Sequence, residues 1–128
     1  MIRKSTRKRL LATHVKRIRG SYFGNLVTRA LDDGGLFGDL SILHEHLPPR
    51  TRLPEIHHRR TSEFVYCVSG SMTAYLGGRK HRITAGSVLV IPRGVRHRFV
   101  TSSRACEAIS LFSPALTIGP GADIHSAP

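Results

Sequence analysis

The stretch Gly86-Ser-Val-Leu-Val-Ile-Pro-Arg-Gly-Val-Arg-His97 decides the fold of this chain. Residues 88–91 are a run of β-branched and aliphatic side chains, which favours a strand. The Pro-Arg-Gly tripeptide that follows is a turn signal. Residues 95–100 then alternate, so that apolar side chains share one face with His97 and arginines take the other. The stretch predicts two strands joined by a tight turn, with an imidazole on the apolar face.

Similar β-rich segments flank this stretch on both sides. Turn signals at Asp32-Asp33-Gly34-Gly35, Pro48-Pro49 and Gly77-Gly78 separate them. Gly70 is expected to close one strand, so that the next segment returns as the second arm of a hairpin. Many short strands without a convincing helix predict an all-β sandwich or barrel. The expected strands are residues 26–30, 40–47, 63–68, 71–76, 81–83, 88–91, 95–100 and 105–112.

Further candidate functional residues lie in a second stretch, Arg50-Thr-Arg-Leu-Pro-Glu-Ile-His-His-Arg-Arg-Thr-Ser-Glu-Phe-Val-Tyr-Cys-Val-Ser-Gly70. Together the two stretches resemble the two signature motifs of the cupin superfamily. The later motif matches at its glycines, proline and histidine, and departs at Thr101, where the family often has asparagine. The earlier motif matches at His58, Glu63 and Gly70. It departs at Arg50, which stands at a glycine position, and at Ile56, which stands at the first histidine position.

The resemblance spans residues 40–114 and implies a cupin jelly-roll β-barrel, often a dimer, with a site inside the barrel. In the family, two histidines and a glutamate of the first motif and a histidine of the second hold a divalent metal. Carried over to this chain, that leaves His58, Glu63 and His97, because Ile56 cannot coordinate. Spacing to the glutamate selects His58. An alternative is that a local bulge turns His57 inward instead.

Two histidines and one carboxylate suit several first-row metals, so the expected ion is Fe, Mn, Ni or Zn. The set is that of non-haem iron oxygenases, and it also suits a Lewis-acid site of isomerase type. The alternative is a non-catalytic ligand-binding or regulatory cupin, in which the three residues persist without metal. Arg50, Arg52 and Arg93 predict an anionic small-molecule ligand in either case.

A fainter resemblance is to ectoine synthase, in residues 64–70 and 111–119. Leu89 stands where that family has a tyrosine ligand, and the family is acidic, so its activity is not transferred to this chain. His44 and His46 share a strand face and are interpreted as surface or partly buried residues, although they could reach a site in the barrel. Tyr66 and Tyr75 are interpreted as packing residues.

The segment 63–68 alternates in a way that bears on assembly. Glu63, Val65 and Cys67 are expected to face the barrel interior, which leaves Phe64, Tyr66 and Val68 outside. An exposed apolar row needs a cover, so a homodimer is predicted. The N-terminal segment is the alternative cover. Cys67 and Cys106 are expected to be free buried thiols, with a disulfide between them as the alternative.

The chain has 128 residues, 40% of them apolar, and a net charge of +12. We expect a basic, flexible arm over residues 1–19, a barrel domain over 20–118 and a loose tail over 119–128. The arm is interpreted as solvated, with a nucleic-acid contact as the less favoured alternative. Since no apolar run approaches a membrane span and no signal peptide is recognised, a cytoplasmic protein is predicted.

Overall fold

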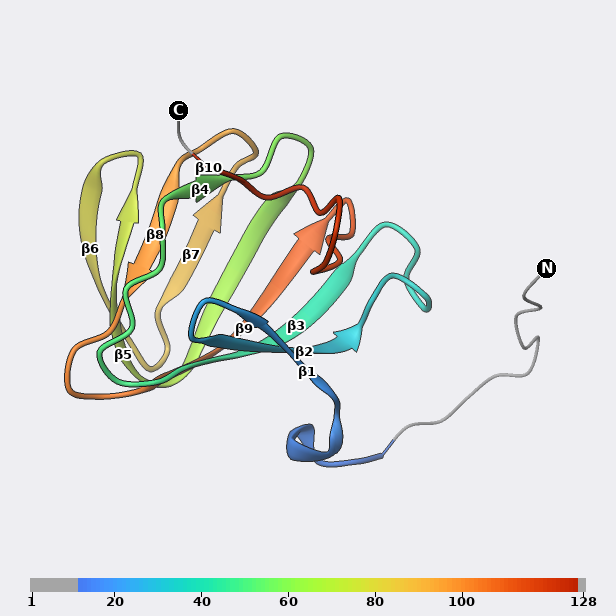
Figure 1. Ribbon diagram of the computed structural model, residues 1–128, viewed down its shortest axis with the longest axis horizontal. Coiled ribbons are helices and arrows are strands. Elements are labelled where there is room, and N and C mark those ends of the chain that lie inside the picture. Colours follow the sequence, from blue (N-terminus) through green and yellow to red (C-terminus); the bar gives the residue numbers. More distant parts are fainter. Residues whose placement is uncertain (1–11, 127–128) are drawn as a thin grey trace.

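Strand pairing is antiparallel throughout residues 12–126, the part of the chain that the computed structural model describes (Figure 1). One short 3-10 helix, η1 (Val15–Arg17), precedes the strands. The expectation of an all-β fold is therefore confirmed. The strands are β1 (Gly20–Phe23), β2 (Leu26–Asp32), β3 (Ser41–Leu47), β4 (Ile56–His57), β5 (Ser62–Leu76), β6 (Arg79–Thr84), β7 (Val88–Ile91), β8 (His97–Val100), β9 (Cys106–Ser113) and β10 (His125–Ser126).

The long strand β5 joins two halves of a curled sheet (Figure 1). Its first part pairs with β9 and β7, and its second part pairs with β6 and β8. From β9 the sheet continues through β3 and β2 to β1, and from β8 it continues through β4 to β10. The sheet thus folds back on itself as a half-barrel typical of the cupin jelly roll, and the inner faces of both halves enclose the core.

Gly70 does not end a strand, contrary to the sequence-based prediction of a hairpin turn there. Strand β5 continues through it and reverses at Gly77-Gly78 instead. Gly70 has a φ of 78°, and a Cβ at this position would lie 1.8 Å from the carbonyl oxygen of Ala105. Glycine is required here because β5 bends closely past the start of β9, next to a register shift between Cys67 and Ser69.

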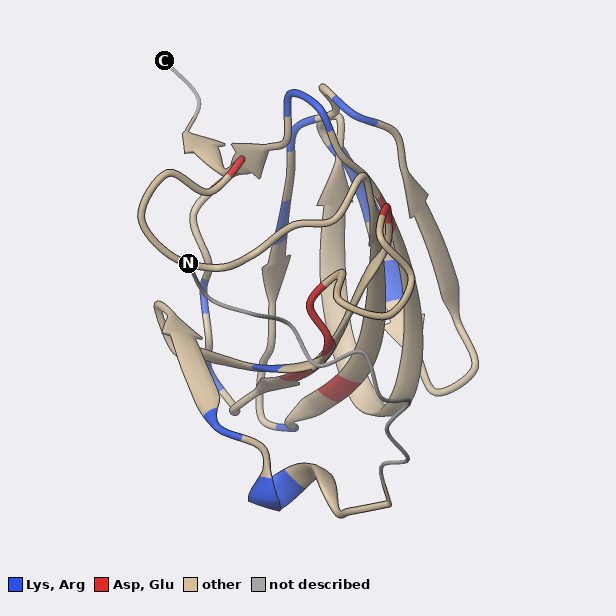
Figure 2. Ribbon diagram, turned by 90° about the vertical axis from the view of Figure 1, so that its right-hand side faces the viewer, with Lys and Arg blue, Asp and Glu red and all other residues tan. Residues whose placement is uncertain are grey.

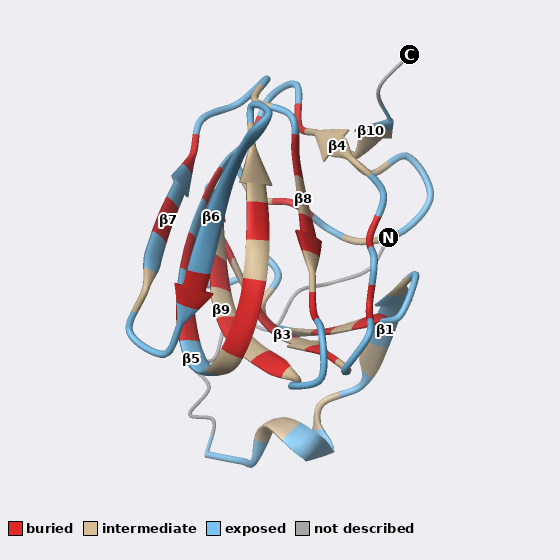
Figure 3. Cartoon of the chain, turned by 90° about the vertical axis from the view of Figure 1, so that its left-hand side faces the viewer, coloured by how far each residue is buried: buried red, intermediate tan, exposed pale blue. Residues whose placement is uncertain are grey.

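The alternation predicted for β5 is confirmed. Glu63, Val65 and Cys67 are buried in the barrel, whereas Phe64 and Tyr66 are exposed on its outer face. Figure 3 shows buried and exposed bands alternating along the strands in the same way. The inner face carries the core cluster, which consists of Leu26, Leu47, Leu53, Val65, Cys67, Met72, Ala74, Ile83, Leu89, Ile91, Phe99, Cys106 and Ala108. The site described below opens from this core.

The two ends of the described chain are tied to the barrel. Near the N-terminus, Arg29 Nε donates to the carbonyl of Ile18 at 3.0 Å. Residues 1–11 of the predicted basic arm lie outside the described residues. At the other end, residues 119–126 were expected to be a loose tail, but β10 pairs with β4 and Asp123 is buried. The C-terminal segment is therefore part of the folded structure.

Lys and Arg residues are spread over several strands and loops of the barrel (Figure 2). Cys67 and Cys106 are both buried free thiols, with their sulfur atoms 3.6 Å apart. Within residues 12–126 no helix has the length and apolarity needed to cross a membrane.

Candidate metal centre

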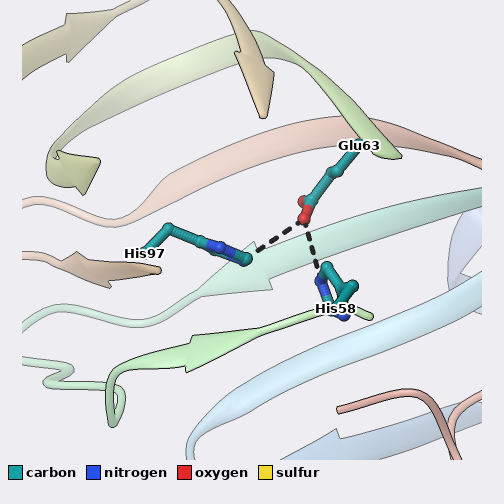
Figure 4. A group of neighbouring side chains, drawn as sticks. All are labelled: His58, Glu63 and His97. Carbon is teal, nitrogen blue, oxygen red and sulfur yellow. Dashed lines mark hydrogen bonds and ion pairs between the residues drawn. The ribbon is translucent and has the colours of Figure 1, made fainter. Parts of the chain in front are cut away.

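His58, Glu63 and His97 meet inside the barrel (Figure 4). His58 Nε2 lies 3.3 Å from Glu63 Oε1, and His97 Nε2 lies 3.4 Å from the same oxygen. One nitrogen or oxygen from each residue falls within 4.8 Å of the other two, and all three residues are buried. Sequence reasoning selected this set, and the fold brings its three members together.

Local structure explains how each side chain reaches this point. Glu63 is an inward-facing residue at the start of β5, and His97 opens β8 directly after the Pro-Arg-Gly turn. His58 follows the short strand β4, and its carbonyl accepts a hydrogen bond from Gly94 N at 2.6 Å. The turn that delivers His97 therefore also anchors the backbone of His58.

Both imidazoles have a fixed orientation. His97 Nδ1 lies 3.0 Å from the carbonyl of Val95, and His58 Nδ1 lies 2.6 Å from the carbonyl of Asp123. A carbonyl oxygen can only accept, so each Nδ1 carries the hydrogen and donates it. In the neutral rings, the Nε2 lone pairs then point at the carboxylate of Glu63. Three electron-rich atoms facing one another require a cation between them, either a proton or a metal ion, and this arrangement fits a metal.

The same contacts control protonation. Burial alone would raise the pKa of Glu63, but hydrogen bonds from His58 and His97 outweigh it and lower that pKa to about 2. Burial alone would lower the pKa of His58, yet its hydrogen bonds to Glu63 and to the Asp123 carbonyl raise that pKa above its usual 6.5. Glu63 is thus ionised at neutral pH, while His58 must release a proton before it can coordinate.

An apolar pocket opens over the three residues. The space inside it that water-sized molecules can occupy is about 40 Å³, and the empty volume reaches about 450 Å³ only when open solvent is included. Glu45 on β3 shares this pocket with the three residues. Apart from these polar groups and Thr28 and Arg98, its lining is apolar, consisting of Phe23, Leu26, Leu53, Pro54, Ile56, Phe99, Phe112, Leu116, Ile118 and Ile124. A small molecule that enters the pocket reaches the histidines through hydrophobic walls.

Comparison with known proteins places this architecture in a family. A family model described as a cupin domain matches residues 43–112, which is more than half of the chain. The chain belongs to the cupin family. SchB from Streptomyces halstedii is 39% identical over 51 residues, which cover 40% of this cupin and 37% of SchB. This cupin thus matches little more than a third of the length of that curated relative.

Two solved structures show the same fold. The polyketide cyclase RemF from Streptomyces resistomycificus superposes with a TM-score of 0.77 at 21% identity, over 94% of this cupin and 87% of RemF. Pac13 from Streptomyces, a nucleoside dehydratase, superposes with a TM-score of 0.68 at 15% identity, over 85% of this cupin and 86% of Pac13. At these identities the likeness establishes the fold.

The structure shows what the three residues that depart from the cupin motifs do. Arg50 has a φ of 59°, the left-handed conformation that glycine adopts most easily, which explains a glycine at this position in the family. Thr101 accepts a hydrogen bond from Thr51 N at 2.9 Å, so it still ties two segments together. Ile56 is the cross-strand partner of His97 and lines the pocket. An apolar side chain therefore occupies the place of the fourth ligand.

The other residues considered from the sequence lie away from the three-residue group. His57 packs against His125, with ring centroids 5.5 Å apart, and does not join the group. His44 Nε2 and His46 Nδ1 contact the carboxylate of Glu107, at 3.0 and 3.9 Å. Both histidines share the strand face opposite Glu45. His46 is partly buried, as interpreted, whereas His44 is buried, with 9% of its surface exposed, so its interpretation as a surface or partly buried residue was wrong.

The arginines predicted to attract an anion are not those that line the pocket. Arg50, Arg52 and Arg93 are exposed and none of them lines the pocket, whereas Arg98 borders it from the strand face opposite His97 and Phe99. The Arg98 guanidinium lies 4.0 Å from the ring centroid of Tyr75, which is a cation–π contact. Tyr75 thus has a packing role, as predicted, and Tyr66 is exposed on the outer face.

Sequence reasoning missed Glu45 and Asp123. Glu45 accepts a hydrogen bond from Ser110 Oγ at 2.7 Å, and burial, followed by repulsion from Glu63, raises its pKa to about 8. Its signal was available, because β3 alternates and places a lone acid between inward-facing Leu43 and Leu47. Asp123 had no comparable signal, since the backbone groups that it binds, those of Arg59 and Arg60, lie 64 and 63 residues away in the chain.

Proposed function

We propose that this cupin is a metal-dependent enzyme of the isomerase or cyclase type that acts on a small, largely apolar molecule. The observation that carries the proposal is the convergence of two Nε2 atoms and the Glu63 carboxylate at an apolar pocket. His58, Glu63 and His97 would hold one divalent ion. Such an ion supplies a Lewis acid that polarises a carbonyl or hydroxyl oxygen of the ligand.

The chain's own residues provide the rest of the chemistry. Apolar side chains such as Phe99 and Leu53 exclude water, which strengthens every polar interaction inside the pocket. Glu45 is a neutral carboxylic acid near pH 7, so it can donate a proton and then accept one back.

The reaction types named for two structural neighbours support this proposal. RemF is a polyketide cyclase, and Pac13 is a nucleoside dehydratase. Ring closure and loss of water both require proton transfer beside a polarised oxygen, which is the task that Glu45 and the metal centre could share.

An oxygenase is the second candidate. The observation that favours it is the set of two histidines and one carboxylate, which leaves coordination positions open. A non-catalytic binding cupin is the third outcome of the test below.

The test uses the cyclic ketone 1-tetralone as a probe of proton transfer. The protein is loaded with Zn(II) or Mn(II), and deuterium uptake beside the carbonyl is followed in D₂O by mass spectrometry. We expect faster uptake than with His97→Ala or Glu45→Gln. Oxygen consumption by the Fe(II)-loaded protein, without deuterium uptake, would favour the oxygenase. Bound metal with neither activity on this probe would support a binding cupin.

We also propose that the protein is a homodimer. Tyr66 and Val88 are cross-strand neighbours on the outer face and are 44% and 52% exposed, and Phe64 and Val90 beside them are 39% and 66% exposed. A second copy that covers this face would remove the apolar surface from water. Light scattering should give the mass of two chains, and Tyr66→Arg should give the mass of one.

A further inference from the structure

The carboxylate of Asp123 binds the backbone that follows His58. Asp123 Oδ1 accepts from Arg59 N at 2.9 Å, and Asp123 Oδ2 accepts from Arg60 N at 2.7 Å. His125 Nε2 lies 2.8 Å from Oδ1 and forms a third contact. Asp123 itself is 5% exposed. A buried carboxylate with three such partners is firmly held, so the backbone of Asp123 is fixed relative to residues 59 and 60.

The main chain of the same residue binds His58 itself. The Asp123 carbonyl accepts the Nδ1 hydrogen of His58 at 2.6 Å. Asp123 therefore binds residues 58–60 at two points. Its carboxylate accepts from the backbone after His58, and its carbonyl accepts from the His58 ring. The ring cannot rotate without breaking one of these contacts. Its second nitrogen, Nε2, therefore stays directed at Glu63.

We propose that Asp123 is a positioning residue of the metal centre, which holds His58 with Nε2 directed at the ion. This inference rests on the metal site of the proposed function. Carbonyl and carboxylate groups that accept from ligand histidines fix the ring orientation in many metal sites, and their loss weakens metal binding by roughly 10- to 100-fold. Here the group comes from the C-terminal segment, whose Ile124 also lines the pocket.

The test measures Zn(II) affinity of the full chain by competition with a chromophoric chelator. Asp123→Ala should bind roughly 10- to 100-fold more weakly than wild type. Asp123→Asn keeps one acceptor oxygen and should lie between the two. Asp33→Ala is the matched control, because Asp33 also accepts from a backbone N–H, that of Gly35, in an exposed turn. The control should bind like wild type, and circular dichroism should show all variants folded.

A second readout does not depend on metal or on a stable Asp123→Ala variant. Long-range ¹H–¹⁵N NMR of the metal-free wild type at pH 8.5 should show the His58 proton on Nδ1. In Asp123→Asn the proton should be distributed over both nitrogens. A wild-type His58 ring without a proton on Nδ1, or unchanged Zn(II) affinity in folded Asp123→Ala, would overturn the positioning role. Wild type that binds no Zn(II) would instead overturn the proposed metal site, and the NMR result would still decide the role of Asp123.

Discussion

The two histidines of the candidate metal centre are held by regions of different kinds. His97 is oriented by the carbonyl of Val95, two residues earlier in the same turn. His58 is oriented by the carbonyl of Asp123, 65 residues later. The local turn alone can orient the His97 ring, whereas the His58 ring is oriented only when the C-terminal segment packs against β4. One half of the site is therefore a property of a motif, and the other half is a property of the complete fold.

Removing either histidine tests this difference with the largest expected effect. His97→Ala and His58→Ala should both abolish measurable Zn(II) binding in calorimetry, because two remaining ligands seldom hold a divalent ion. Their effects on the chain should differ. His58→Ala removes a contact of the C-terminal segment, so amide exchange of residues 119–126 should accelerate there and not in His97→Ala.

His57→Ala is the control for this pair, because His57 lies outside the three-residue group. It should keep the Zn(II) affinity of wild type. Loss of binding in His57→Ala together with normal binding in His58→Ala would show that the other histidine is the ligand.

Metal affinity should depend on pH through His58. Its pKa is raised above 6.5, so a proton occupies the ring below that pKa and must leave when metal binds. Zn(II) affinity should fall about tenfold per pH unit below this pKa and level off above it. Glu63, with a pKa of about 2, stays ionised and adds no slope between pH 5 and 9.

The same titration sharpens the contrast between the two regions. The negative charge of the Asp123 carboxylate is one cause of the raised His58 pKa, so Asp123→Asn, which removes this charge, should move the inflection to lower pH. An affinity that is flat between pH 5 and 9 would mean that no proton is displaced from His58.

Ile56→His adds a ligand on β4, close to His58, in the region that depends on the contact between His58 and Asp123. Ile56 is the cross-strand partner of His97 and lines the pocket, so an imidazole there can reach the centre. Zn(II) affinity should rise by about tenfold or more, since each added ligand contributes binding energy. Calorimetry of the double variant Ile56→His, His97→Ala should then recover part of the binding that His97→Ala loses.

The contrast also explains how far the sequence could predict the site. The turn before His97 was predictable because its spacing and its partner carbonyl are local. The path of β5 was not, since Gly70 looks like a turn until the close approach of Ala105 is known. The tail over residues 119–128 was predicted to be loose because chain termini usually are. What orders it is the pairing of Asp123 with distant backbone groups, which no local pattern encodes.

The last expected effect is on stability instead of metal binding, and it concerns Glu45, which lies on β3 in the pocket wall. Its folded-state pKa of about 8 lies above the 4.5 of an unperturbed carboxyl, so stability is fully present below pH 4.5 and declines as pH rises towards 8. Glu45→Gln cannot ionise. In the metal-free protein it should match wild type near pH 4.5 and exceed its free energy of unfolding at pH 8.5 by a few kcal/mol, on the order expected for this shift. Urea unfolding at the two pH values measures this, and equal stability at pH 8.5 would show that Glu45 ionises in the fold without cost.

The most direct test of the metal centre is calorimetric titration of the wild-type chain with Zn(II), Mn(II), Ni(II) and Fe(II), the last under anaerobic conditions. We expect one ion per chain for at least one of these metals, and loss of that binding in Glu63→Gln, which keeps the shape of the side chain but removes its charge. If wild type binds none of the four, and Ile56→His gains no binding, then His58, Glu63 and His97 do not form a metal site.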